Sequence, residues 1–327
     1  MSNAVFTEEK IKSICDSVTD IDEVEALRLK YRSKSRKHLF ISLAIVAIIA
    51  PVAIFTADPI ISLIAIVFVI VLVGILWTTM VLPAHKKLKT MFQDKLIRNY
   101  IGAVLDNSQF IPDKHHSLDT YYESMLYTVN VDRENGENYV EGKFDKTELS
   151  FSYIHTEYKK VTHTKHGTKT SWYTIFQGVF LCADSNKHFA GKTLILPDTA
   201  EKYLGGFGKW LQRQAGNPVG EMVYMENRKF EKDFVVYSTD PVEARYLITP
   251  RIQEEIVNIK KILQTDFRLS FINGHIFVAI SRGAIFQLKP SLSFTDPATL
   301  RYYLKDILEL LSLIHQLDLN IRIWTKQ

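Results

Sequence analysis

The polar side chains whose types and spacing are most suited to chemistry lie between Tyr237 and Tyr246. Asp240 precedes a proline, Glu243 follows three residues later, and Arg245 is two residues further on. A carboxylate beside a guanidinium can form an ion pair at a ligand or catalytic site. The same spacing also suits a helix start, with Asp240 as N-cap and Glu243 at the third helical position. The stretch Tyr237, Asp240, Glu243, Arg245 and Tyr246 is therefore predicted to be a partner or ligand site or a capped helix, and capping explains most of the pattern.

Histidines give a second candidate, but they lack the partners that a metal site needs. His163 and His166 are three residues apart, and His155 lies upstream. Zinc requires three or four ligands in fixed geometry, and no cysteine or carboxylate stands beside this pair. We therefore expect 163–170 to be a polar, solvated loop between two strands, and no metal ligand is predicted.

A glycine-rich run and two cysteines complete the candidates. Gly205-Gly206-Phe207-Gly208-Lys209 is similar to a phosphate-binding loop, but Trp210 stands where that motif has serine or threonine. Glycines that end a helix account for it better. Cys15 and Cys182 fit no CxxC pattern, which favours unpaired thiols in a reducing compartment. No cofactor or catalytic residue is predicted, and an enzyme is disfavoured.

The strongest compositional feature is an apolar block from Leu39 to Leu82, in which Asp58 is the sole ionisable residue. The block divides at Ala57-Asp58-Pro59 into 39–56 and 60–82. At about 1.5 Å per residue, these segments reach about 27 Å and 34 Å, against a hydrocarbon core of about 30 Å. The sequence therefore predicts a transmembrane hairpin.

Basic residues flank both ends of this block. Six Lys/Arg and no acid lie between Ala26 and His38, and five Lys/Arg with one acid lie between Ala84 and Arg98. Such flanks stay in the cytoplasm, so we expect a multi-pass membrane protein with both termini cytoplasmic. The flanks also favour contact with the bilayer and its anionic headgroups. The residues concerned are Arg32, Lys34, Arg36, Lys37, Lys86, Lys87 and Lys89.

Beyond these flanks the chain is electrically neutral. Residues 99–327 hold 27 basic and 27 acidic side chains. A nucleic-acid-binding domain needs a basic face, so no nucleic-acid partner is predicted.

Helical spacing is expected before and after the hairpin, and strand patterns follow from about Tyr139. The fold class is therefore α+β: an N-terminal two-helix transmembrane hairpin with a helical stalk, then a sheet-dominated antiparallel cytoplasmic domain. The expected division is 1–38, 39–82, 83–106 and 107–327. The expected strands are 139–144, 148–161, 172–183, 188–196, 221–225, 230–238, 268–272 and 275–280, with a further one at 284–288, and helices are expected to start at Asp240, Thr249 and Asp296.

The stretch Phe234-Val235-Val236-Tyr237-Ser238-Thr239-Asp240 with Glu243-Ala244-Arg245-Tyr246-Leu247-Ile248-Thr249-Pro250 resembles the core of an uncharacterised bacterial membrane protein family, domain-of-unknown-function family 3137. Tyr139–Phe144, Phe176-Gln177-Gly178 and Arg322-Ile323-Trp324 extend the resemblance over most of 20–327. It implies a location in the bacterial inner membrane, two early spans, a cytoplasmic domain and an envelope role. It also implies a membrane protein partner of LemA type, and it supplies no catalytic residues.

Three functions remain open on the sequence. The first is a membrane-anchored binding or scaffold module for a protein partner or lipid headgroups. The second is a membrane-tethered enzyme with a cleft beside Asp240–Arg245. The third is an oligomeric channel or transporter component, although the spans lack the intramembrane charges that pores usually need.

Overall fold

The computed structural model describes residues 7–18, 20–55, 59–164, 167–185, 189–198 and 220–317. The chain divides into two compact units, each continuous in space but not in sequence. The helical unit contains Glu8–Tyr100 and Leu288–Leu304, and the sheet unit contains Ile101–Gln287 and Lys305–Gln327 with the first seven residues. The predicted membrane turn at 57–58, the glycine run at 205–209, His166 and the segment 322–324 lie outside the described residues.

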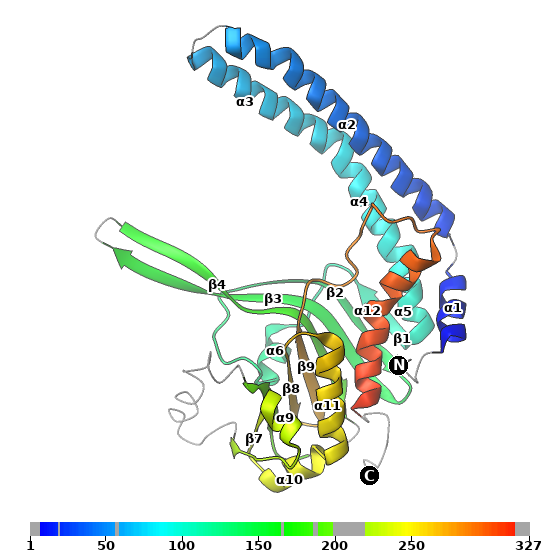
Figure 1. Ribbon diagram of the computed structural model, residues 1–327, viewed down its shortest axis with the longest axis vertical. Helices are drawn as coiled ribbons and strands as arrows, with labels where there is room; N and C mark the ends of the chain where they lie inside the picture. The colour runs from blue at the N-terminus through cyan, green and yellow to red at the C-terminus, as the bar shows by residue number, and fades with distance from the viewer. Residues whose placement is uncertain are drawn as a thin grey trace. The chain divides into compact units, whose positions relative to one another are not determined.

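The N-terminal region is helical, as predicted (Figure 1). One continuous helix runs from Pro59 to Val104, so Pro83 does not end it. A π-helical turn directly precedes this proline, and such a turn accommodates a residue that cannot donate to the carbonyl four residues back. The elements are α1 (Glu8–Asp16), α2 (Ile21–Phe55), α3 (Pro59–Leu76), η1 (Trp77–Val81), α4 (Leu82–Met91), η2 (Phe92–Ile97) and α5 (Arg98–Val104).

The segment 288–304 joins the helical unit through a buried carboxylate. Glu25 of α2 accepts hydrogen bonds from Arg28 at 2.6 Å, from Ser293 Oγ at 2.9 Å and from the Phe294 backbone N–H at 2.9 Å. These donors, led by Arg28, lower the pKa of Glu25 to about 2. The Phe294 ring then packs 5.7 Å from the ring of Phe92. Charge and aromatic packing together hold this distant segment on the helices.

The sheet unit is built on a nine-stranded antiparallel sheet within the described residues. The strand order is β1-β2-β3-β4-β9-β8-β5-β7-β6, and the pairing is antiparallel throughout. The predicted α+β class with a sheet-dominated domain is confirmed. The strands are β1 (Asp106–Ile111), β2 (Arg133–Phe144), β3 (Thr147–Thr164), β4 (Gly167–Asp184), β5 (Thr193–Pro197), β6 (Glu221–Met222), β7 (Phe234–Ser238), β8 (Phe267–Ile272) and β9 (His275–Ser281).

Several strand expectations differ from the structure. The first part of the expected strand 230–238 forms helix α9 (Arg228–Asp233), because the Asn227 side chain caps it by accepting from the N–H groups of Lys229 and Phe230. The segment 284–288 contains no strand. The expected loop at 163–170 is strand on both sides of its tip, since β3 and β4 pair as far as Thr164 and Gly167.

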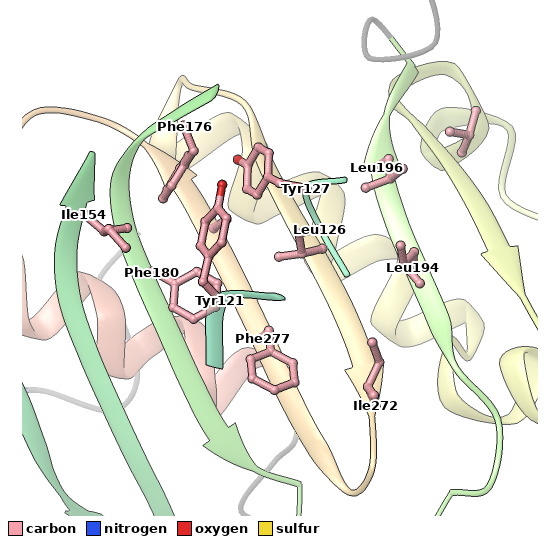
Figure 2. Close-up of a cluster of buried hydrophobic side chains, with 12 residues drawn as sticks. Tyr121, Leu126, Tyr127, Ile154, Phe176, Phe180, Leu194, Leu196, Ile272 and Phe277 are labelled. Carbon is pink, nitrogen blue, oxygen red and sulfur yellow. The ribbon is translucent and has the colours of Figure 1, made fainter. Parts of the chain in front are cut away.

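One sheet face carries a cluster of buried apolar side chains (Figure 2). Tyr121 of α6 (Leu118–Glu123) lies within it, with its ring stacked on Tyr127 at 5.4 Å and 5.8 Å from Phe180. Its hydroxyl shares a hydrogen bond with Thr156 at 3.1 Å, so the buried polar atom is satisfied. The cluster comprises Tyr121, Leu126, Tyr127, Ile154, Phe176, Phe180, Leu194, Leu196, Val235, Ile272, Phe277 and Ala279.

Helices accompany the remaining strands. Lys260 of α11 (Pro250–Leu263) reaches Asp233 at 3.3 Å and lies over the Phe234 ring of β7. Arg282, after β9, bonds Asp306 at 2.6 Å and Glu309 at 3.2 Å. Two more helices among the described residues are α10 (Pro241–Leu247) and α12 (Pro297–Gln316). The first eight residues of α12 belong to the helical unit and the rest to the sheet unit.

Candidate functional site

The apolar part of the helical unit exposes its side chains. The helix Pro59–Val104 is, among the described residues, the one long and apolar enough to cross a membrane, judged by length and composition. None of its most apolar 18-residue window is buried. The apolar part of α2 is exposed in the same way, with Phe40 at 69% and Ile48 at 72% of their full accessibility. Exposed apolar surface of this extent indicates a site of interaction with a membrane or another protein.

Helix α2 lies against η1 and α4 through two ring contacts. His38 stands edge-on to Trp77 at 5.5 Å, and its Nε2 is 3.3 Å from the carbonyl of Val73. Tyr31 stands edge-on to His85, also at 5.5 Å. These contacts fix which part of one helix faces which part of the other.

The contacts bring the two basic flanks together. The residues from Arg28 to Lys37 and from Lys86 to Lys89 lie within about two helical turns of the Tyr31–His85 contact. Arg32, Arg36, Lys86 and Lys87 are exposed there. We call Arg32, Lys34, Arg36, Lys37, Lys86, Lys87 and Lys89 the basic collar.

The stretch Tyr237–Tyr246 in the sheet unit forms the capped helix that the sequence allowed. The Asp240 carboxylate accepts from the N–H groups of Val242 and Glu243, both at 3.0 Å, and so caps α10. Tyr237 lies in β7 and packs against the buried cluster. Tyr246 is 76% exposed.

Glu243 has a structural role that its local sequence did not indicate. Its carboxylate accepts from the backbone N–H groups of Ala190 at 2.9 Å and Gly191 at 2.7 Å, more than fifty residues away. Thr239 Oγ1 accepts from the N–H of Lys192 at 2.8 Å beside it. A Cβ at Gly191 would lie 2.6 Å from a carboxylate oxygen of Glu243, so the Glu243 side chain would have to shift. Glu243 therefore ties the start of β5 to the start of α10.

Arg245 does not join Glu243 in an ion pair in the described part of the chain. Its guanidinium donates to the carbonyl of Pro241 at 3.3 Å, one turn earlier. The hollow beside it has a volume of about 70 Å³. Small-molecule sites are usually 300–1,000 Å³, so this hollow does not fit a metabolite. The structure thus brings Asp240 and Glu243 into one turn, and the hollow beside Arg245 among the described residues is small.

A larger polar cleft of about 460 Å³ opens over β2, β3, β4 and β9, and the sequence analysis did not identify it. Glu141, Glu148 and Asp184 contribute carboxylates to it, and Cys182 lies at its wall. Burial raises the pKa of the Cys182 thiol to about 12. A thiol that stays protonated at neutral pH is a poor nucleophile.

His116 is a buried residue whose role depends on tertiary structure. Its Nδ1 is 2.7 Å from Ser152 Oγ and its Nε2 is 2.9 Å from Ser150 Oγ. Burial is the main cause that lowers the pKa of His116 to about 3. The ring is therefore neutral and holds two strand serines. In the sequence, its only signal is the adjacent pair His115-His116.

The candidate histidines His155 and His163 are hydrogen-bonded within the β3–β4 hairpin. His155 Nε2 is 3.0 Å from Thr174 Oγ1, and His163 Nδ1 is 3.1 Å from Thr168 Oγ1. Over the described ranges, no group of three or more His, Cys, Asp or Glu side chains is arranged to hold a metal ion.

Comparison with known proteins finds one family model. Residues 174–319 are similar to the family described as "Protein of unknown function (DUF3137)". Curated protein sequences give no significant match. A solved structure, the mycobacterial trehalose monomycolate transport factor A, TtfA, is similar at a TM-score of 0.34 and 10% identity, over 69% of this chain and 96% of that one. A similarity at this level decides nothing about the function of this chain.

Proposed function

We propose that this chain is a bacterial inner-membrane protein whose α2–α3 hairpin spans the bilayer with both termini in the cytoplasm. Its sheet unit then serves as a non-enzymatic module that binds a protein partner or lipid headgroups.

The observation that carries the proposal is the exposed apolar surface of α2 and α3. Seventeen large apolar side chains between Leu39 and Trp77 are exposed among the described residues. Fully burying one such side chain gives about 1.5–3 kcal/mol, so half-exposure of seventeen forgoes roughly 15 kcal/mol. That figure matches the whole stability of a typical domain, about 5–15 kcal/mol. Lipid chains supply the missing environment along the full length of the hairpin.

The basic collar supports the orientation. The collar gathers seven Lys/Arg at one end of the apolar surface, beside the ring contact of His38 with Trp77. Lysine and arginine remain on the cytoplasmic side, and tryptophan favours the interface. The collar therefore supports a cytoplasmic location for the sheet unit and for the polar part of the helical unit.

A binding role is favoured over catalysis by the state of the candidate groups. The Glu243 carboxylate is occupied by two backbone N–H groups, and the Cys182 thiol stays protonated. An enzyme needs a base or nucleophile whose pKa suits its task.

Membrane fractionation and topology reporters test the anchor. The full-length protein should stay in the membrane pellet after alkaline carbonate extraction, and deletion of residues 39–82 should release it. A C-terminal alkaline phosphatase fusion should be inactive and a C-terminal green fluorescent protein fusion fluorescent. Release of the full-length protein by carbonate would refute the span, whereas an active phosphatase would refute only the orientation.

Co-purification of the full-length protein from native membranes tests the binding role. We expect a reproducible membrane protein partner, with a LemA-type protein as the specific candidate from the family resemblance. A larger, defined homo-oligomer without a partner would instead favour the channel alternative.

A further inference from the structure

The hairpin of β3 and β4 extends beyond every other strand of its sheet. The two strands pair from Leu149–Ala183 to Thr164–Gly167. Strand β2 accompanies β3 only as far as Glu157, and β9 accompanies β4 only from Gly178 onward. Residues 158–164 and 167–173 therefore form a two-stranded ribbon, which we call the arm. Figure 1 shows it projecting away from the other strands of the sheet unit.

The arm is about seven residues long on each strand, or roughly 24 Å. An isolated two-stranded ribbon is marginally stable in water. Its root is reinforced: Arg133 lies over the Trp172 ring at 4.3 Å and bonds Glu157 at 2.6 Å, and the Tyr158 and Tyr173 rings stack at 5.3 Å. These contacts stabilise the root of the arm.

The exposed surface of the arm combines lysine with aromatic and aliphatic side chains. Lys159, Lys160 and Lys169 are exposed. Trp172 is 41% exposed, and Tyr173 is 44% exposed. Both rings lie at the root of the arm, and exposed large rings of this kind mark an interaction surface.

Acidic side chains are absent from the described residues of the arm. The nearest carboxylates stand at its root and are engaged there. Asp132 accepts from the backbone N–H of Lys159 at 2.6 Å, and Glu157 is bonded by Arg133. The lysines of the arm therefore face solvent without compensating acids on the same ribbon, which suits an anionic surface.

The partner that fits this chemistry is a lipid surface. Tryptophan and tyrosine favour the headgroup region, and lysine is attracted to anionic lipids of the cytoplasmic leaflet. Lysines on strand edges also discourage pairing with another strand, so the arm is poorly suited to strand addition.

We propose that the β3–β4 arm binds the anionic surface of a bilayer, with its lysines on lipid phosphates and the Trp172 and Tyr173 rings, which lie on opposite faces of its root, in the headgroup region. This inference rests on the proposed function in one respect: the hairpin anchor keeps the arm close to a membrane. The arm would then be a second, reversible contact that positions the sheet unit at the bilayer.

An environment-sensitive fluorophore on the arm of the full-length protein tests the proposal. Thr170 is exposed on the same ribbon face as Trp172 and suits the label, introduced as Thr170→Cys with Cys15→Ser and Cys182→Ser. The protein is reconstituted into vesicles of pure phosphatidylcholine or of phosphatidylcholine with 30% phosphatidylglycerol. We expect blue-shifted emission and reduced acrylamide quenching in the anionic vesicles only.

A charge-matched pair of variants isolates the lysines. Neutralising Lys159, Lys160 and Lys169 together with glutamine should lower the ratio of bound to unbound arm on the order of 100-fold, since each lysine contributes about a factor of five. The control replaces the exposed Lys229, Lys232 and Lys261, which belong to α9 and α11, and should leave the emission unchanged.

The outcomes separate this inference from the anchor. Failure to float with pure phosphatidylcholine vesicles would refute the anchor. Normal flotation with identical emission in both vesicle types would overturn the arm proposal alone, as would an equal loss in the control variant. A response to an added oligonucleotide in neutral vesicles, without a response to phosphatidylglycerol, would also overturn it and assign the arm to nucleic acid.

Discussion

Replacing His116 with glutamine should remove most of the sensitivity of the sheet unit to mild acid. The His116 ring is packed 5.1 Å from Tyr139 and 5.2 Å from Phe180, and both of its nitrogens contact serine hydroxyls. Protonation would bury a charge among these groups, with Lys114 and His115 nearby adding repulsion. The folded protein therefore resists a proton that the unfolded chain accepts.

The size of the effect follows from the two pKa values. The pKa of His116 is about 3 in the folded chain, against an ordinary value of 6.5. Because the folded pKa is lowered, stability is intact above about pH 6.5 and falls as pH drops towards 3. A pH of 5 lies about 1.5 units below the ordinary pKa of 6.5. Proton binding there stabilises the unfolded chain by about 2 kcal/mol relative to the folded chain. Glutamine has no such titration and retains a donor and an acceptor for the serines.

Urea unfolding of the full-length protein in mild detergent, at pH 7.5 and pH 5.0, measures this difference. Wild type should lose about 2 kcal/mol more unfolding free energy than His116→Gln over this interval. The control is His155→Gln, whose ring bonds Thr174 near the surface and whose loss should preserve the wild-type pH dependence. Equal losses in wild type and His116→Gln would refute the reasoning.

Three further substitutions test other contacts. Glu25→Gln should destabilise the helical unit by about 2 kcal/mol at pH 7. Because the folded pKa of Glu25 is lowered, the variant should also lose less stability than wild type between about pH 4.5 and 2. Thermal melts measure both effects, and Glu23→Gln, at an exposed position, should show neither. Gly178→Ala should cost several kcal/mol in urea unfolding, since a Cβ there meets the backbone of β9, whereas Gly102→Ala in α5 has room and should gain about 0.5–1 kcal/mol. Glu243→Gln should cost about 1 kcal/mol and speed amide exchange at 190–191, while unchanged exchange there would contradict its tie to that loop.

Local features were predictable because the residues that cause them are neighbours in the chain. Asp240 caps α10 as its spacing with Pro241 indicated. The turn between β8 and β9 falls at Asn273-Gly274, where both residues have the positive φ that this dipeptide tolerates. The motif Phe176-Gln177-Gly178 is part of the family resemblance. The structure explains its glycine, because the backbone of β9 approaches Gly178 too closely for a side chain.

Long-range features could not be predicted from spacing. The backbone partners of Glu243 lie more than fifty residues away, and Ser293 and Phe294 bond Glu25 from more than 260 residues away. The candidate pair Glu243 and Arg245 suggested a site because both are charged and only one residue separates them. In the fold, one side chain turns to a distant backbone and the other to its own helix.

The sequence by itself determined the apolar block, its basic flanks and the α+β class, because hydropathy, charge and strand periodicity are properties of short windows. Only the tertiary structure decided which charged groups are already occupied, that the segment 288–304 joins the helical unit, and that lysines and aromatic rings of β3 and β4 share one projecting arm. The physical reason is that a hydrogen bond or a shared surface depends on distance in space, and closure of long loops brings together residues whose separation in the chain carries no signal.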